Sequence, residues 1–194
     1  MQFASEKPWV IHIGNNDRIA ARAQDKGFVC IGWTKMGDLT SFDSRDKMRA
    51  AYRRFYPDAS EGTLRSSYGQ PYLFAHKVKT GDLLVYPVKG SRDVCVGRVS
   101  SDYVWAGDDA DLLKNDYCHL RRVEWLKRLP RIAFSPAALH SFGSLASISS
   151  SDEFFEEVVG LLKDDGSPTP QRLTSLVRKK PRRMTKTRAL SRRI

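Results

Sequence analysis

The sequence predicts an α+β domain in which about five strands form a small mixed sheet or barrel, with short helices between them. Short apolar runs that are typical of strands recur along the chain. Two helical segments separate the second run from the third, and the turn-rich KGSRD joins two later runs as a hairpin. Strands and helices do not alternate regularly, which argues against a parallel βαβ sheet.

The first elements are a strand, a helix and a second strand. The apolar run WVIHI predicts a strand at 9–13, and FVCIGW predicts a more central strand at 28–33. Between them, 17–27 has the pattern of a short helix, with Asp17 as its N-cap and Gly27 at its C-terminal end.

The next part of the chain is predicted to be helical. The segment 44–57 carries apolar residues at helical spacing. In 58–69, Asp58 and Glu61 are three residues apart and form a possible capping box. The segment 70–78 has a proline near its start, where helices tolerate it.

The clearest β signal is the hairpin formed by 81–88 and 93–105. The elements expected after it are a strand, a short helix, a short strand and a final helix, at 119–126, 135–143, 145–149 and 152–162. Ser150 and Glu153 are expected to cap that final helix.

The net charge of +11 is concentrated at the C-terminus. All acidic residues lie at or before Asp165, whereas 167–194 contains ten Lys or Arg, so residues 1–166 have a net charge of only about +1. We therefore expect a folded domain at 1–163 and a disordered basic tail at 164–194. The tail either binds polyanions or is a solubilising end without a specific role. Its candidate phosphate contacts are Arg178, Lys179, Lys180, Arg182 and Arg183.

Composition favours a soluble, cytoplasmic protein without a membrane partner. No apolar run approaches the length of a transmembrane helix, and the N-terminus lacks a secretory pattern. The three scattered cysteines, Cys30, Cys95 and Cys118, indicate reduced structural thiols.

No motif in the sequence indicates a reaction, a cofactor or a metal. The histidines lack cysteine partners at zinc spacing, and there is neither a phosphate-binding Gly-rich loop nor a nucleophile elbow. The spacing of Glu124 and Lys127 does not fit a nuclease site. The cluster of Asp108, Asp109 and Asp111 has two interpretations, a cation site or, more simply, a solvated loop.

Aromatic residues at the ends of strands are the main candidates for a binding site. Trp33 ends one predicted strand, and Tyr103 and Trp105, which are two residues apart on one strand, point the same way. If the three rings face each other across a pocket, they can stack a planar base. The alternative is that these rings pack beneath loops. Further polar candidates for the same pocket are Asn15, Asn16, Asp17, Asp38 and Asp102.

The order of motifs between residues 8 and 163 resembles the PUA-like superfamily. A strand ending in IGW is followed by helices, by GDLLVYP, a turn, VCVGRV with Y-x-W after it, and HLRRVEWL…LPR. The similarity is greatest to the N-terminal recognition module of Mrr-type modification-dependent restriction endonucleases. EVE and YTH domains are more distant relatives.

The resemblance implies a small, strongly curved mixed β-barrel with flanking helices, and a pocket that binds a flipped or exposed base. By position, Trp33 and Trp105 match the family's pocket aromatics, and Tyr103 is a weaker match. In Mrr-type proteins a nuclease domain follows, whereas here a basic tail does. This departure leaves three interpretations open: a lone reader, a fragment of a longer protein or a degenerate gene. The resemblance implies a non-catalytic reader in a restriction or defence system, for which a separate nuclease subunit is a candidate partner.

The leading hypothesis is a reader that flips a methylated or hydroxymethylated base out of DNA. Phosphate contacts would come from the tail and from Lys89, Arg92, Arg121 and Arg122. Three alternatives stay open: an RNA reader, an enzyme on nucleobases or nucleotides that uses Asp38 or Asp102 as acid–base, and a protein-interaction subunit of a defence complex.

Overall fold

The computed structural model describes residues 8–14 and 16–164. Asn15 and the five tail cations proposed as phosphate contacts lie outside the described residues. Their roles, and the expected domain boundary at 163, therefore stay predictions.

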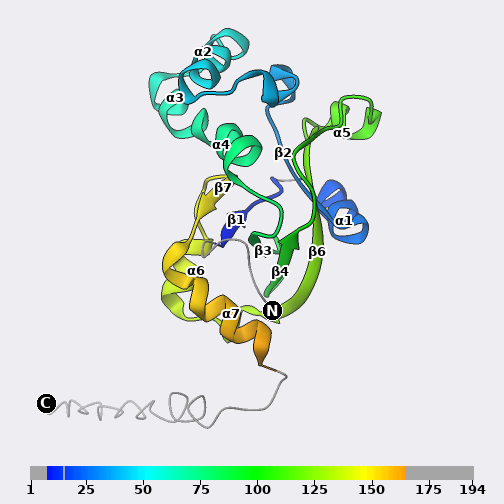
Figure 1. Cartoon of the computed structure of the whole chain (residues 1–194), viewed down its shortest axis with the longest axis vertical. Coiled ribbons are helices and arrows are strands. Elements are labelled where there is room, and N and C mark those ends of the chain that lie inside the picture. Colours follow the sequence, from blue (N-terminus) through cyan, green and yellow to red (C-terminus); the bar gives the residue numbers. More distant parts are fainter. Residues whose placement is uncertain (1–7, 15, 165–194) are drawn as a thin grey trace, which may run out of the picture. The chain divides into compact units, whose positions relative to one another are not determined.

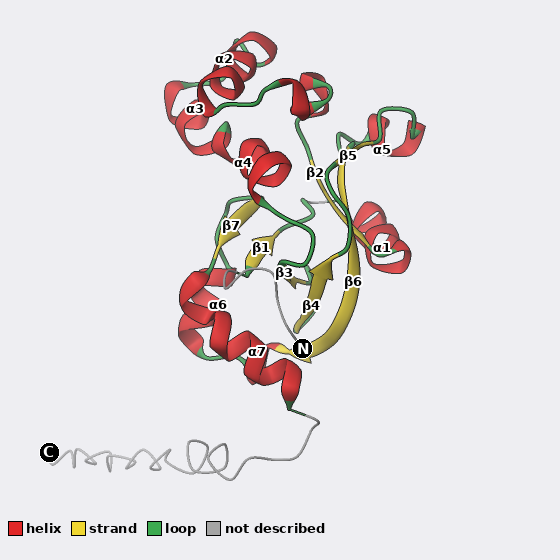
Figure 2. Cartoon of the chain, in the orientation of Figure 1, coloured by secondary structure: helices red, strands yellow, loops and turns green. Residues whose placement is uncertain are grey.

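The strands form one mixed, strongly curled sheet, which confirms the predicted α+β class (Figure 2). Its order is β2-β6-β4-β3-β1-β7, and β5 pairs with β6. Among the described strands, β1 and β3 pair in parallel and all other pairs are antiparallel. The strands are β1 (Trp9–Ile11), β2 (Phe28–Ile31), β3 (Leu83–Pro87), β4 (Asp93–Val99), β5 (Val104–Trp105), β6 (His119–Pro130) and β7 (Ile148–Ser150).

The long strand β6 produces much of the curvature. Its first half pairs with β2 and β5, and its second half pairs with β4. Between Val96 and Gly97 the register shifts, because Leu126 on β6 has no partner residue opposite it. Such a bulge bends the strand and increases its twist. Gly97 suits the bend, since a Cβ there would lie 2.5 Å from a methyl carbon of Val123.

Helices cover both ends of the sheet, with α2–α4 at one end and α6 and α7 at the other (Figure 1). They are α1 (Asp17–Lys26), α2 (Arg45–Phe55), α3 (Glu61–Ser67), α4 (Gly69–Tyr72), α5 (Ala110–Lys114), α6 (Pro136–Phe142) and α7 (Phe155–Lys163). A π-helical turn, Leu73–Lys77, continues α4. Single 3₁₀ turns lie at Thr34–Met36, Leu39–Ser41, Arg131–Ala133 and Asp152–Phe154.

Three of the expected helix caps are wrong, although the helices are present. Asn16, not Asp17, caps α1 by accepting a hydrogen bond from the Ile19 amide. Ser60, not Asp58, caps α3. Ser150 belongs to β7 and caps no helix. In each case periodicity located the helix, but the conformation of the preceding loop decided which side chain reaches the free amides.

The buried apolar residues form three clusters. One fills the curled sheet beneath α1, a second lies between β3, β4 and the helices α6 and α7, and a third holds α2–α4 together. Trp33 and Tyr103 pack against both the first and the third cluster. These two rings therefore join the sheet to the helical segment α2–α4. The three cysteines are buried and unpaired.

Candidate functional site

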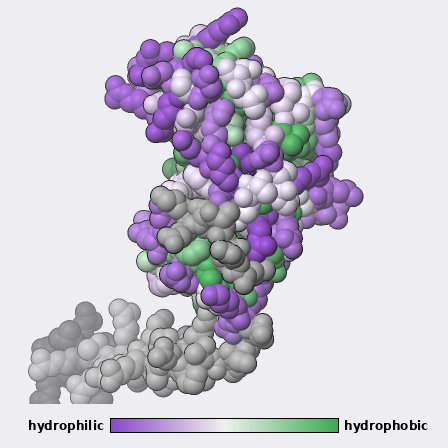
Figure 3. Space-filling model, viewed as in Figure 1, coloured by the Kyte–Doolittle hydropathy of each residue, from purple (hydrophilic) through white to green (hydrophobic). Residues whose placement is uncertain are grey.

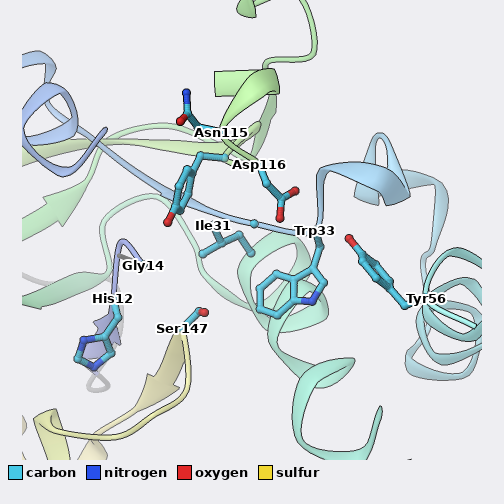
Figure 4. A pocket seen from close by; sticks show the side chains of 10 residues that line it. His12, Gly14, Ile31, Trp33, Tyr56, Asn115, Asp116 and Ser147 are labelled. Carbon is cyan, nitrogen blue, oxygen red and sulfur yellow. The ribbon is translucent and has the colours of Figure 1, made fainter. Parts of the chain in front are cut away.

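A cavity of about 280 Å³ opens beside the C-terminal ends of β1 and β2 (Figure 4). Its walls come from five separate parts of the chain. The lining residues are His12, Gly14, Ile31, Gly32, Trp33, Tyr56, Asn115, Asp116, Tyr117 and Ser147. Figure 4 shows the carboxylate of Asp116 and the phenol of Tyr56 pointing toward the indole of Trp33.

Trp33 is held in a backbone conformation that a bulky residue rarely adopts. It follows β2 with φ 68° and ψ 28°, in the left-handed region. The Met36 amide donates to the Trp33 carbonyl at 2.9 Å. This hydrogen bond closes a turn that directs the chain away from the sheet. A strained conformation of this kind persists only where surrounding packing enforces it, and such sites are often functional.

Asp116 is the second strained residue of the cavity, with φ 62°. The Thr34 amide donates to Oδ1 of Asp116 at 2.7 Å, so the residue after Trp33 is tied to the loop that carries Asp116. Gly32 allows the close approach, because a Cβ there would lie 3.1 Å from Oδ2 of Asp116. The exposed carboxylate is thus held at the mouth of the cavity.

Two tyrosines complete the aromatic wall. A Cβ on Gly14 would lie 1.9 Å from the Tyr117 hydroxyl, so Tyr117 can occupy its position only beside a glycine. Gly14 also has φ 35°. On the opposite side, burial raises the pKa of Tyr56, which keeps this phenol neutral at physiological pH.

Asn16 and Asp17 do not line the cavity. Asn16 donates from Nδ2 to Oδ1 of Asn115 at 2.8 Å, while Asn115 donates to the Asp111 carbonyl at 2.7 Å. Asn16 therefore positions a cavity residue and caps α1. The Asp17 side chain is exposed and lies 3.9 Å from the Lys89 ammonium group.

Tyr103 and Trp105 flank His119 and are not among the residues that line the cavity. The Leu39 amide donates to the Tyr103 hydroxyl, and a hydrogen bond of 2.8 Å joins that hydroxyl to Nδ1 of His119. The ring of Trp105 lies 5.0 Å from the His119 ring. Burial lowers the pKa of His119 to about 4, so its imidazole is neutral at physiological pH.

The cavity therefore includes Trp33 but not Trp105 or Tyr103, which had been expected to face it across one pocket. The Tyr103 hydroxyl is occupied inside the protein, and Trp105 lies against Gly107, where a Cβ would come within 2.5 Å of its Nε1. Neither ring lines the cavity. Alternation along a strand correctly gave Tyr103 and Trp105 a common face, but it could not show which residue of β6 lies against that face.

The remaining acidic candidates also lie outside the cavity wall. Asp38 caps the 3₁₀ turn after it, accepting from the amide and hydroxyl of Thr40 at 2.9 and 2.8 Å. Asp102 is exposed on the loop between β4 and β5. The sequence reasoning missed Tyr56, Tyr117 and Asp116. Of these, Asp116 had a usable signal, because Asn and Asp tolerate left-handed turns.

The proposed phosphate contacts divide into exposed and buried cations. Lys89 lines a second hollow of about 580 Å³, which shares His12, Gly14 and Ser147 with the cavity. Arg92 and Arg122 are exposed.

Arg121, by contrast, is 2% exposed and unable to reach a phosphate, which corrects its expected role. Its guanidinium donates to the carbonyls of Phe74, Ala75 and Ser101. Two of these carbonyls belong to the last helical turn before β3, where intrahelical donors are missing.

Within the described ranges, no three His, Cys, Asp or Glu side chains are grouped so that they could hold a metal ion. Asp109 and Asp111, which had suggested a cation site, instead pair with Arg22, and Asp111 also pairs with Arg18. No helix in the part of the chain that the structure describes is long and apolar enough to span a bilayer.

Residues 9–149 match the family described as "Domain of unknown function (DUF8426)". The chain belongs to this family. Every lining residue of the cavity, from His12 to Ser147, falls within the part that matches DUF8426. No curated protein matches the chain.

A solved structure similar to this DUF8426 chain is the YTH domain of the Zygosaccharomyces rouxii MRB1 protein in complex with N6-methyladenosine RNA. The sequences are 13% identical, the alignment covers 84% of this chain and 90% of the other, and the TM-score is 0.45.

Proposed function

We propose that this chain is a non-catalytic reader that takes one modified base of a nucleic acid into the cavity beside Trp33. The observation that carries the proposal is the strained backbone of Trp33, which holds its indole next to the tethered carboxylate of Asp116. Strain at two residues of one cavity is typical of a preorganised binding site.

The size and lining of the cavity suit a single planar group. Small-molecule sites usually enclose about 300–1,000 Å³, so a cavity of about 280 Å³ lies just below that range and suits a ligand no larger than one base. An indole that stacks on a base contributes roughly 1–3 kcal/mol per base. Trp33, Tyr56 and Tyr117 provide aromatic surface, and Ile31 provides an apolar contact for an added methyl group.

The polar groups suit the edge of a base. The Asp116 carboxylate accepts hydrogen bonds only, so it favours an exocyclic amine such as those of cytosine and adenine. Ser147 lies elsewhere in the lining and adds a hydroxyl, whereas the side-chain amide of Asn115 is already bonded to Asn16 and Asp111. This combination discriminates between bases by edge as well as by stacking.

Phosphates would be held by exposed cations outside the cavity. In such a module the pocket recognises the base, and the cations position the phosphate backbone. Lys89, beside the adjoining hollow, is the best placed of the predicted contacts, and Arg92, Arg122 and the tail cations remain candidates. The resemblance to Mrr-type modules favours DNA and a role in restriction or defence with a separate nuclease. RNA is the alternative nucleic acid.

The test is equilibrium binding of the full chain to matched duplex DNAs and single-stranded RNAs, each with and without methylated or hydroxymethylated bases, at two salt concentrations. We expect one modified ligand to bind at least tenfold more tightly than its unmodified match. Trp33→Ala should abolish that ratio, whereas Trp33→Phe should retain part of it. Equal binding to every modified and unmodified pair would overturn the proposal.

A further inference from the structure

Positive charge is unevenly distributed over the folded part of the chain. Between Arg45 and Lys77 there are seven Lys or Arg and three Asp or Glu, whereas the rest of residues 1–166 has sixteen and nineteen. The helical segment α2–α4 with its π-helical turn is therefore net positive, and the remainder is net negative. Figure 3 shows the hydrophilic surface that covers α2 and α3.

Three of these cations lie over two tyrosine rings. Arg45 lies 6.0 Å and Lys77 5.7 Å from the centre of the Tyr72 ring, and Arg49 lies 5.9 Å from that of Tyr68. We call Arg45, Arg49 and Lys77 the tyrosine-backed cations. Cation–π contacts hold a guanidinium in place without using all of its N–H donors, so the side chain is ordered but can still bind an anion.

These cations differ from their neighbours in their ionic partners. On the same helix, Lys47 pairs with Asp43 at 2.9 Å, and Arg53 pairs with Glu61 at 2.8 Å. Among the described residues, no carboxylate lies within ion-pair distance of Arg45, Arg49 or Lys77. Their charge is therefore available to an external anion.

The helix that carries Arg45 and Arg49 leads to the base cavity. Tyr56, the C-cap residue that follows α2, lines the cavity. Arg49 precedes Tyr56 by seven residues, which corresponds to about 10 Å along a helix axis. Stacked nucleotides advance about 3.4 Å each along a strand. Arg45 precedes Tyr56 by eleven residues, or about 16 Å. A strand with one base in the cavity could thus place phosphates about three and about five nucleotides away beside Arg49 and Arg45, respectively.

We propose that the tyrosine-backed cations bind phosphates of the nucleic acid strand that flanks the base in the cavity. That the bound anion is a nucleic acid rests on the proposed reader function, whereas the cluster of Arg45, Arg49 and Lys77 does not. Arginine favours phosphate because its planar N–H edge matches two phosphate oxygens. Successive arginines one helical turn apart, about 6 Å, can contact neighbouring phosphates of one strand.

The experiment measures the salt dependence of binding of the full chain to modified and unmodified nucleic acid. Each phosphate contact contributes about 0.9 to the slope of log K against log salt on duplex DNA and about 0.7 on single strands. Arg45→Gln/Arg49→Gln should lower the slope by roughly 1.4–1.8, and should weaken both ligands equally, leaving the modification ratio unchanged.

The matched control is Lys47→Gln/Arg53→Gln, which removes the same charge from the same helix at two already paired cations, and should leave the slope nearly unchanged. Arg45→Lys/Arg49→Lys keeps the charge and should retain most of the slope. Circular dichroism melting establishes that each variant is folded.

The proposal would be overturned if Arg45→Gln/Arg49→Gln and Lys47→Gln/Arg53→Gln changed the salt slope equally. It would also be overturned if neither variant changed it. If Arg45→Gln/Arg49→Gln lowers the salt slope but the chain shows no preference for a modified base, the reader function is wrong and phosphate binding by the tyrosine-backed cations is supported. If the chain prefers a modified base and Arg45→Gln/Arg49→Gln leaves the salt slope unchanged, only the proposed phosphate binding by these cations is wrong. A last competitor is polyglutamate. If it displaces the bound nucleic acid as well as an unmodified oligonucleotide of equal charge does, these cations form a site for acidic proteins, and the proposal is overturned.

Discussion

Trp33 and Asp116 are the two non-glycine residues with positive φ among those the structure describes, and both line the same cavity. Holding each in the left-handed region costs on the order of 1–3 kcal/mol. The hydrogen bond from the Thr34 amide to Asp116 joins the two strained turns. The indole and the carboxylate are thus placed by one coupled backbone arrangement.

That coupling predicts different effects for two changes at Asp116. Asp116→Ala removes the acceptor of the Thr34 amide, so we expect a loss of about 1 kcal/mol in the free energy of unfolding and a weaker preference for the modified base. Asp116→Asn keeps an acceptor at Oδ1 and should keep the stability, but it loses the negative charge. Urea unfolding and the binding panel measure both quantities. Identical behaviour of the two variants would contradict the coupling.

Gly14 should be more sensitive than another glycine with positive φ. Gly14→Ala combines a strained φ with a clash against the Tyr117 hydroxyl, and should destabilise by about 3 kcal/mol and disturb the cavity wall. At Gly90, with φ 72°, a Cβ meets nothing within 4 Å, so Gly90→Ala should cost only about 1 kcal/mol. Denaturant unfolding of both variants tests this order, and equal losses would refute it.

Trp105 should matter for stability and not for base preference. Its ring packs on His119 and does not line the cavity, so Trp105→Ala should lower the free energy of unfolding by about 3 kcal/mol. At a temperature where the variant is folded, the ratio of modified to unmodified binding should equal that of the wild type. Loss of the ratio in a folded Trp105→Ala would restore the original expectation of one shared aromatic pocket.

Adjacent arginines on β6 should differ in their effect on stability. Arg121→Met leaves three backbone carbonyls without their donor and should cost about 3 kcal/mol. Arg122 is exposed, and Arg122→Met should change stability by less than about 0.5 kcal/mol. Thermal unfolding at matched ionic strength measures the difference. A small effect at Arg121 would contradict its role as the donor to these carbonyls.

His119 should make the fold sensitive to acid. Burial lowers the pKa of His119 to about 4, while the backbone of Trp33 and, to a lesser degree, Asp116 and Asp38 oppose that shift. Below pH 6.5 the unfolded chain binds a proton that the folded chain does not, so stability should fall between pH 6.5 and pH 4 by roughly 3 kcal/mol.

Burial also lowers the pKa of His12, so His12 likewise reduces the free energy of unfolding as the pH falls. Urea unfolding of wild type and His119→Gln across pH 4–7.5 measures the contribution of His119. A pH dependence as steep in the variant as in the wild type would show that His119 is not responsible.

The sequence by itself determined the local elements of this protein. Apolar runs located β2, β3, β4 and β6, and helical spacing with Ser44 and Ser135 ahead of it located α2 and α6. These signals are local because periodicity and capping depend on residues within a few positions of each other. The candidate Trp33 was found in the same way, as an aromatic residue directly after a buried strand.

Only the tertiary structure decided which residues share a site. The cavity is formed by residues from β1, β2, the end of α2, the loop before β6 and the loop before β7, and no spacing in the sequence relates these segments. The same is true of Arg121, whose burial depends on carbonyls more than forty positions earlier. Long-range contacts follow from how the sheet curls, and that curl depends on the bulge and on packing of the three apolar clusters.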